Sequence, residues 1–114
     1  MKASCAVKEN HVFRRMYRKG KSAVRSGLVV YCAKTGRPRS RLGVTVGTKL
    51  GKAVVRNRVR RRFRELFRLH AGEIKGSYDV ILVGRGRSAD MPWAKLEGQY
   101  LACLRELGMV EDRP

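Results

Sequence analysis

The stretch from residue 51 to residue 67, GKAVVRNRVRRRFRELF, constrains the fold of this chain more than any other. After Gly51 neither glycine nor proline interrupts it, and its arginine, leucine, alanine and glutamate residues favour a helix. At about 100° per residue, the apolar positions gather within roughly a third of the helix circumference. These positions are Val55, Val59, Phe63, Leu66 and Phe67, followed by His70. The pattern predicts one amphipathic helix whose apolar arc packs against a core.

The opposite arc of this predicted helix is basic. Between residues 52 and 68 the chain carries eight basic residues and one acid, Glu65. The basic residues are Lys52, Arg56, Arg58, Arg60, Arg61, Arg62, Arg64 and Arg68. Exposed helix faces ordinarily mix charges of both signs, because like charges four residues apart repel each other and slightly destabilise the helix. We therefore expect a partner outside the chain to neutralise this arc, and predict that it binds RNA or DNA.

Composition supports a single folded domain over residues 1–114 that binds a polyanion. A chain of 114 residues is long enough for one modest core, and its hydrophobic fraction of 43% is that of a folded protein. The formal net charge is +18, the footprint of a nucleic-acid-binding protein. Residues 1–89 hold 24 basic and 4 acidic residues, whereas residues 90–114 hold 3 and 5. We expect the acidic C-terminal part to face away from the polyanion.

The cysteines and histidines indicate neither a disulfide framework nor a metal site. Cys5, Cys32 and Cys103 are odd in number and lack a CxxC spacing, and the chain has two histidines. Cys32 and Cys103 lie in apolar runs and are expected to be small core residues. No apolar stretch approaches the length of about 18 residues that spans a bilayer, and residues 1–12 do not resemble a signal peptide. We expect a cytoplasmic protein without a membrane partner, and find no indication of an obligate protein partner.

The region before residue 20 predicts a short helix over residues 10–19, with Gly20 as a left-handed stop. Its apolar side chains form two rows, Val12 with Met16 and Phe13 with Tyr17. Both rows could belong to a core, or one could be buried while the other forms an aromatic lining beside arginines. The pattern favours the core for Phe13 and leaves the place of Tyr17 open.

Alternating or continuous apolar residues predict four strands. They cover residues 21–25 weakly, and residues 28–33, 42–47 and 78–83 more strongly. In the third strand Gly43, Thr45 and Gly47 leave one face nearly bare, which suits a closely packed helix or a ligand on the sheet. The fourth strand, YDVILV, is apolar on both faces and is expected to be central.

Two basic loops and a last helix complete the predicted order. Residues 34–41 form a basic turn expected to reach phosphates, and residues 84–87 form either a partner-contacting loop or a plain turn. A final helix is expected to be capped by Asp90, with Pro92 in its first turn. Its core stripe comprises Trp93, Leu96, Tyr100, Leu101, Leu104 and Leu107. The order α-β-β-β-α-β-α predicts an α+β fold, a two-layer α/β sandwich on a mostly antiparallel four-stranded sheet.

The chain has the residues of an RNA-binding protein and lacks those of a protein nuclease. Hydrolysis of RNA by protein groups needs a general acid and base, or carboxylates that hold a metal. The acids here are few and scattered, and His70 falls on the core-facing arc. The chain offers arginines for phosphates, Asn57 for a hydrogen bond, and Phe13, Tyr17 and Tyr31 for stacking on bases. We predict a non-catalytic RNA-binding protein that contacts backbone and shape.

Residues 42–61, LGVTVGTKLGKAVVRNRVRR, resemble the signature of the protein component of bacterial ribonuclease P. That signature is a strand ending in a Ser-Lys-Lys-like turn, followed by Gly-x-Ala-Val-x-Arg-Asn-Arg-x-Lys-Arg on a helix. The Phe13-x-x-x-Tyr17 pair, Gly20, the strand with Tyr31 and the YDVILV strand followed by arginine agree as well. The chain departs from the pattern at Gly47-Thr48, where Ser-Lys is usual, and at Arg60, where lysine is usual.

The resemblance implies a fold with a left-handed β-α-β crossover, shared with a ribosomal protein domain. It implies that the chain is the protein subunit of an endoribonuclease that removes the 5′ leader of precursor tRNA, with hydrolysis carried by the RNA subunit and by Mg²⁺ held mainly by RNA. The residues implied to bind ribonuclease P RNA are Lys52, Arg56, Asn57, Arg58, Arg60, Arg61 and Arg64. The residues implied to line a cleft for the leader are Phe13, Tyr17, Tyr31 and Lys49.

Two other functions compete with this interpretation. The first is a ribosomal or ribosome-assembly RNA-binding protein without a nuclease role, since the implied fold and the charge of +18 suit either. The Arg56-Asn57-Arg58 block together with the Phe13 and Tyr17 row argues against it, because a structural ribosomal protein needs no leader cleft. The second is a protein nuclease that uses His11 or His70.

Overall fold

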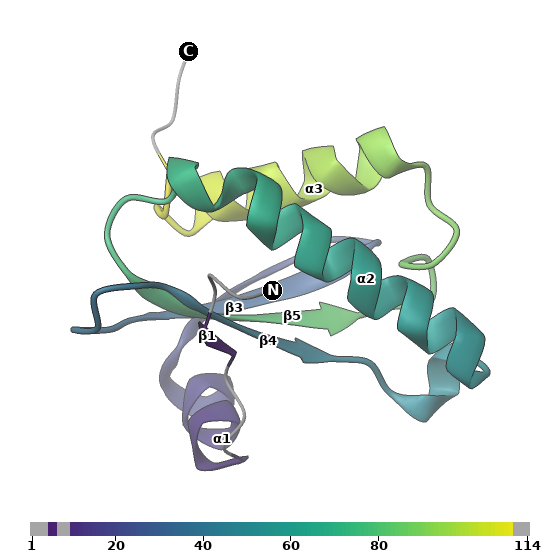
Figure 1. Cartoon of the computed structure of the whole chain (residues 1–114), viewed down its shortest axis with the longest axis horizontal. Coiled ribbons are helices and arrows are strands. Elements are labelled where there is room, and N and C mark those ends of the chain that lie inside the picture. Colours follow the sequence, from purple (N-terminus) through teal and green to yellow (C-terminus); the bar gives the residue numbers. More distant parts are fainter. Residues whose placement is uncertain (1–4, 7–9, 111–114) are drawn as a thin grey trace.

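The computed structural model of the chain describes residues 5–6 and 10–110, and the side chains of residues 14–18 and 20–110. Within these residues, five strands form one sheet in the order β1-β4-β5-β3-β2 (Figure 1). The strands are β1 (Cys5–Ala6), β2 (Lys21–Val24), β3 (Leu28–Lys34), β4 (Arg41–Thr45) and β5 (Tyr78–Gly84). The helices are α1 (Asn10–Lys19), α2 (Ala53–His70) and α3 (Trp93–Glu106), with short 3₁₀ turns η1 (Thr48–Leu50) and η2 (Ala71–Glu73).

The α+β class and the order of the predicted elements are confirmed. The YDVILV strand, β5, is central: it pairs antiparallel with β3 and parallel with β4. The structure differs from the prediction in having an additional strand, β1, which pairs parallel with β4. The sequence does not predict it because two residues are too few to show an alternating pattern. Among the four predicted strands, β2–β3 and β3–β5 pair antiparallel and β4–β5 pairs parallel, so the mostly antiparallel four-stranded sheet is confirmed, and β1 adds a second parallel pair at its edge.

Helix α2 connects β4 to β5, which are parallel neighbours. In Figure 1, β4 runs from left to right in front of β5, and α2 returns above the sheet. The chain therefore turns left-handed as it passes from β4 through α2 to β5, the rare hand for such a connection. The carboxyl ends of β4 and β5 meet at one edge of the sheet, so the segments that follow them lie close together.

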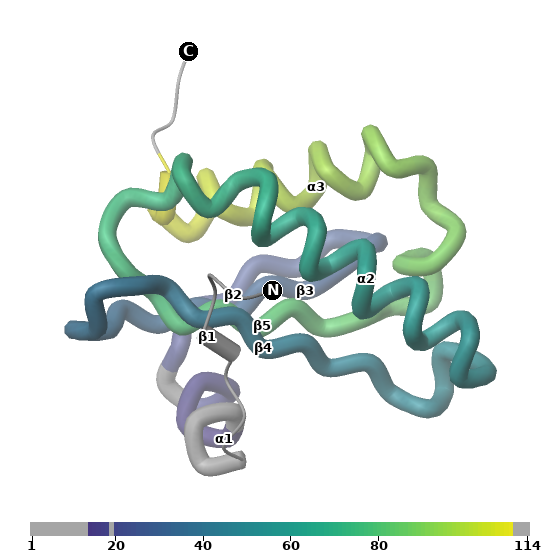
Figure 2. Tube along the Cα trace, viewed as in Figure 1, coloured from purple at the N-terminus to yellow at the C-terminus, as the bar shows by residue number. Residues whose placement is uncertain are grey.

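The two faces of the sheet are covered differently. Helices α2 and α3 lie over one face and α1 lies on the other, as the traces in Figures 1 and 2 show. The core is under α2 and α3, where β-strand residues such as Val30 and Leu82 are fully buried. On the α1 face, Met16 packs against Ile81 in a smaller cluster. The predicted two-layer sandwich thus describes the sheet with α2 and α3, and α1 adds a partial third layer.

The predicted helix faces are largely confirmed. In α2, Val59, Phe63, Leu66 and Phe67 are buried, while Val55 and His70 are half-buried. In the stripe of α3, Leu96, Tyr100, Leu104 and Leu107 are buried, and Trp93 and Leu101 are half-buried. Cys32 and Cys103 are buried free thiols, as expected.

The prediction that Asp90 caps the last helix is wrong. Helix α3 begins at Trp93 with Pro92 as its N-cap residue, and no side chain caps it. The proline sets the boundary because its ring fixes an extended entry to the helix. Asp90 lies exposed in the preceding loop.

Arg41 also departs from the prediction, which placed it in a phosphate-reaching loop. It is the first residue of β4 and is buried opposite Asp79 of β5. Its Nε and Nη2 donate to the two carboxylate oxygens of Asp79, each at 2.8 Å. A buried arginine needs such a bidentate partner, so this guanidinium holds β4 against β5 inside the protein.

Gly20 ends α1 for a different reason from the one predicted. It does not adopt a left-handed backbone; among the described glycines only Gly51, Gly76 and Gly108 do. Its N–H donates to the Met16 carbonyl at 2.9 Å. A Cβ at this position would lie 2.7 Å from the Met16 oxygen and 2.9 Å from the Cys32 oxygen. Glycine is needed because the end of α1 approaches the backbone of β3.

We predict that Gly20→Ala lowers the free energy of unfolding by about 1–3 kcal/mol, since both crowding atoms belong to the backbone and cannot rotate away. Gly98→Ala is the matched control. Gly98 lies in α3 with open space around a Cβ, so alanine there should raise stability by about 0.5–1 kcal/mol. Urea unfolding measures both, and equal stabilities of the two variants would contradict the close-approach explanation.

Among residues 5–6 and 10–110, none of the helices combines the length and apolarity needed to cross a bilayer.

Candidate nucleic-acid interface

The basic arc of α2 faces away from the core. Arg58, Arg61 and Arg64 are exposed, as are Asn57 and the N-cap residue Lys52. Arg56 and Arg60 are half-buried. The structure therefore brings all seven residues of the predicted RNA-binding set onto one helix and its first turn.

Two arginines of this set also form hydrogen bonds within the protein. Arg60 Nη1 donates to Asn57 Oδ1 at 2.8 Å, which orients the amide of this exposed asparagine. Arg56 Nε donates to the Gly51 carbonyl at 3.1 Å. Gly51 has a φ of 132°, in a region that other residues rarely adopt. Arg56 therefore secures the turn that leads from η1 into the helix.

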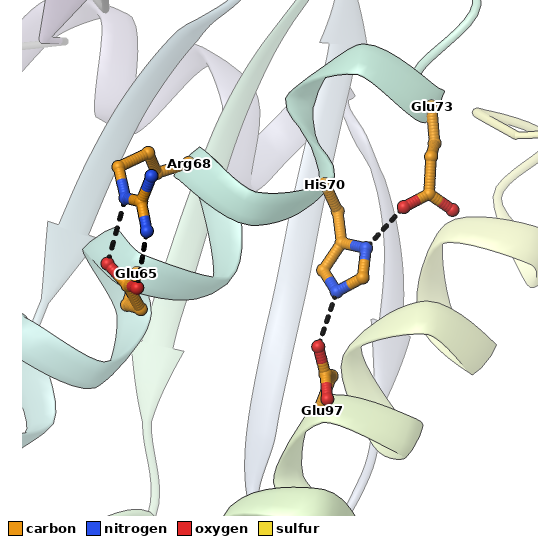
Figure 3. Close-up of polar contacts among 5 residues, drawn as sticks. All are labelled: Glu65, Arg68, His70, Glu73 and Glu97. Atoms are coloured by element: carbon orange, nitrogen blue, oxygen red, sulfur yellow. Dashed lines mark hydrogen bonds and ion pairs between the residues drawn. The ribbon is translucent and has the colours of Figure 1, made fainter.

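The one acid of the arc is already paired. Arg68 donates to both carboxylate oxygens of Glu65, through Nε at 3.0 Å and Nη2 at 2.6 Å (Figure 3). Hydrogen bonding to Arg68 lowers the pKa of Glu65 and raises the pKa of Arg68. Because this exposed pair is local to one turn, Glu65 leaves Arg58, Arg61 and Arg64 uncompensated.

A second surface lies on the opposite face of the sheet, and we call Tyr17, Tyr31 and Thr45 the tyrosine surface. The rings of Tyr17 and Tyr31 meet edge to face, with centroids 4.9 Å apart and an interplanar angle of 77°. The hydroxyls of Tyr17 and Thr45 are hydrogen-bonded at 3.0 Å. Tyr17 is 41% exposed. This settles the open question about α1: Met16 belongs to the core, and Tyr17 to the surface.

The remaining residues predicted to line a leader cleft are less closely defined. Lys49 is exposed in η1, beyond the carboxyl end of β4. Phe13 falls within α1, but its side chain lies outside the described ones. Thr45 was missed as a site residue, although the small-residue face of its strand was the signal that could have found it.

His70 is a structural residue in this fold. Its Nε2 is hydrogen-bonded to Glu97 of α3 at 2.7 Å, and its Nδ1 to Glu73 of η2 (Figure 3). Partial burial lowers the pKa of His70, but the hydrogen bonds and charges of Glu73 and Glu97 outweigh it and raise the pKa. With both ring nitrogens engaged, His70 joins the end of α2 to α3 and is not available as a general base.

Comparison with known proteins decides the family. A family model described as ribonuclease P matches residues 1–108. The chain belongs to the ribonuclease P protein family. It is 39% identical to the ribonuclease P protein component of Clostridium novyi over 111 residues, which cover 96% of this chain and 98% of that protein.

Solved structures agree with the family. The ribonuclease P protein of Staphylococcus aureus superposes with a TM-score of 0.83 at 31% identity, covering 95% of this chain and 99% of that one. The ribonuclease P protein of Thermotoga maritima gives a TM-score of 0.78 at 28% identity, covering 94% and 98%. Family membership favours the ribonuclease P interpretation over the ribosomal alternative.

Among the side chains that the structure describes, those of residues 14–18 and 20–110, no group of three or more His, Cys, Asp or Glu that could hold a metal ion occurs. We assign no step of the reaction to a protein-bound ion. The side chain of His11, the other histidine considered for catalysis, lies outside the described ones.

We predict that the contribution of His70 to the stability of this protein falls as pH rises. Its pKa in the folded chain is raised above 6.5, so the stabilisation is fully present below that value and is lost as pH passes the folded pKa. The difference in unfolding free energy between the wild type and His70→Gln should shrink as pH rises above about 6.5. Glu97→Gln should weaken this pH dependence, whereas a difference independent of pH would contradict the assignment.

Proposed function

We propose that this chain is the protein subunit of a ribonuclease P holoenzyme, and that it binds both the catalytic RNA and the 5′ leader of precursor tRNA. The observation that carries the proposal is the separation of two RNA-compatible surfaces by one sheet. Helix α2, with its exposed arginines, lies over one face of the sheet, and α1, which carries Tyr17 of the tyrosine surface, lies on the other (Figure 1). A chain that binds a single RNA helix needs only the first of these.

The α2 face suits the folded catalytic RNA. The exposed guanidinium groups of Arg58, Arg61 and Arg64 can each donate two parallel hydrogen bonds to a phosphate. Lys52 adds a point charge at the start of the helix, while Arg56 and Arg60 hold the turn and the Asn57 amide in place. These contacts recognise backbone shape, so they fit a partner whose specificity comes from its tertiary fold.

The tyrosine surface suits a single strand. Stacking of a base on an aromatic ring contributes about 1–3 kcal/mol and tolerates any base, which is what a leader of variable sequence requires. Tyr17 and Tyr31 hold each other edge to face, so an arriving base meets rings that are already oriented. Phe13 would extend the aromatic row, and Lys49 would contact a leader phosphate.

In this proposal the protein supplies affinity and the RNA supplies hydrolysis. Two RNA molecules repel each other, and each phosphate neutralised by arginine or lysine releases condensed counterions. The protein therefore lowers the cost of holding substrate against the catalytic RNA, while Mg²⁺ is held mainly by the RNA and the substrate. The proposal includes a cytoplasmic location and requires neither a membrane nor an obligate protein partner.

Reconstitution tests this function. We predict that the purified chain, added to a bacterial ribonuclease P RNA at low Mg²⁺, stimulates release of the 5′ leader from precursor tRNA, and that His70→Gln does so equally well. The protein without RNA should release nothing. Leader release by the RNA-free protein, or no stimulation of the RNA, would refute the proposed division of labour.

The leader assignment has its own test. Tyr17→Ala and Tyr31→Ala should weaken binding of precursor tRNA by the holoenzyme by about 1–3 kcal/mol each, because each removes one stacking platform. Binding of mature tRNA, which has no leader, should be unchanged. Thr45→Ala provides a comparison that keeps both rings and removes only the hydroxyl contact with Tyr17. Equal losses for precursor and mature tRNA would move the leader away from this surface.

A further inference from the structure

Residues 85–91, which make up most of the loop between β5 and α3, are held in place by a buried serine. Ser88 is fully buried, and its hydroxyl donates to the Gly27 carbonyl at 2.5 Å while accepting from the Arg85 N–H at 2.7 Å. The Ser88 N–H donates back to the Arg85 carbonyl at 2.9 Å, and the Met91 N–H donates to the Arg87 carbonyl at 3.0 Å. The backbone of this short loop is thus fixed at several points.

One arginine of α2 secures the loop from the other side. Arg62 donates through Nη1 to the Ser88 carbonyl at 2.7 Å and through Nη2 to the Met91 carbonyl at 2.5 Å. Its guanidinium also lies 5.8 Å from the centroid of the Trp93 ring. Arg62 therefore uses its donors inside the protein, unlike Arg58 and Arg61 on the same helix.

The loop presents two cations that no described side chain neutralises. Arg85 and Arg87 are both exposed, and Asp90 is the one acid within residues 85–91. The charge of Asp90 acts on Arg62, where it partly offsets the lowering of the Arg62 pKa by burial and by Arg58. An arrangement that holds two unpaired arginines on a fixed backbone suits an anionic partner.

The topology puts these cations beside the basic end of α2. Since β4 and β5 are parallel neighbours, the turn η1 that follows β4 and the loop that follows β5 lie at the same edge of the sheet (Figure 1). Gly84 lets the end of β5 approach η1 and α2 closely, because a Cβ there would lie 2.6 Å from Leu50 of η1 and 3.4 Å from Val59 of α2. The loop and the first half of α2 therefore lie at one end of the molecule, beside η1, whose Lys49 the proposed function gives to the leader.

We propose that Arg85 and Arg87 bind phosphates of the ribonuclease P RNA and extend the α2 interface, with Arg62 as the positioning residue that holds their loop. The inference rests on the proposed function of α2 as the site of the catalytic RNA. We assign the loop to that RNA and not to the leader because Arg62 fastens it to α2, on the opposite side of the sheet from the tyrosine surface.

The test is the salt dependence of binding between the full chain and ribonuclease P RNA without substrate. The double variant Arg85→Ala/Arg87→Ala should reduce the slope of log affinity against log salt by about 1.4–1.8, since each lost phosphate contact removes about 0.7–0.9. Arg61→Ala should reduce it by about one. The matched control Lys95→Ala/Arg105→Ala, which removes two exposed cations from α3, should leave the slope unchanged.

The outcomes separate this inference from the function on which it rests. If Arg61→Ala lowers the slope and the loop variant does not, the loop assignment is overturned and the function stands. If the wild-type chain has no salt-dependent affinity for the RNA, the proposed function itself fails. A loss by the loop variant that occurs only with precursor tRNA carrying a leader would overturn the assignment to the catalytic RNA.

A double-mutant cycle between Arg62 and the two loop arginines tests the role of Arg62. Arg62→Lys keeps the charge but cannot reach both carbonyls with a planar fork, so it should weaken RNA binding in the wild-type background. In the Arg85→Ala/Arg87→Ala background it should have little further effect, because the residues that it positions are absent. Equal losses in both backgrounds would overturn the positioning role.

Discussion

The structure depends on helix α2. One arc of this helix packs against the core, and the opposite arc carries uncompensated positive charge. Burial of a large apolar side chain contributes about 1.5–3 kcal/mol, and α2 buries Val59, Phe63, Leu66 and Phe67. Repulsion between like charges one turn apart costs about 0.2–0.5 kcal/mol per pair. Packing against the sheet therefore outweighs the repulsion, and the charged arc can remain open to a polyanion without unfolding the helix.

The sheet lets one small domain carry two separate surfaces. Successive residues of β3 point to opposite faces, so Val30 and Cys32 enter the core under α2 and α3 while Tyr31 faces α1. The crossover from β4 to β5 places α2 on the core side, and Gly20 allows α1 to approach from the other. The proposed division between catalytic RNA and leader follows this two-sided arrangement.

The arginines of the basic run are not equivalent, although they look alike as a string of letters. Arg62 bonds two loop carbonyls and Arg68 pairs with Glu65, so both are used within the protein. Arg56 secures the turn before α2. Arg58, Arg61 and Arg64 are the ones whose guanidinium groups remain for a partner. A loss of RNA affinity in an arginine variant therefore has a different physical meaning at each position.

The sequence by itself determined α2, its two arcs, the central strand, the order of elements and the family, because helical and strand periods are local and the Arg56-Asn57-Arg58 block is contiguous. Only the tertiary structure decided what the side chains meet. Arg41 was predicted to reach phosphates, yet it is buried against Asp79, which lies 38 positions away. The helical pattern leaves the place of Tyr17 open, and the hydrogen bond with Thr45, 28 positions away, holds it at the surface. A periodic pattern predicts which face of an element a side chain lies on. The residues that it contacts there come from distant parts of the chain, which only folding brings together.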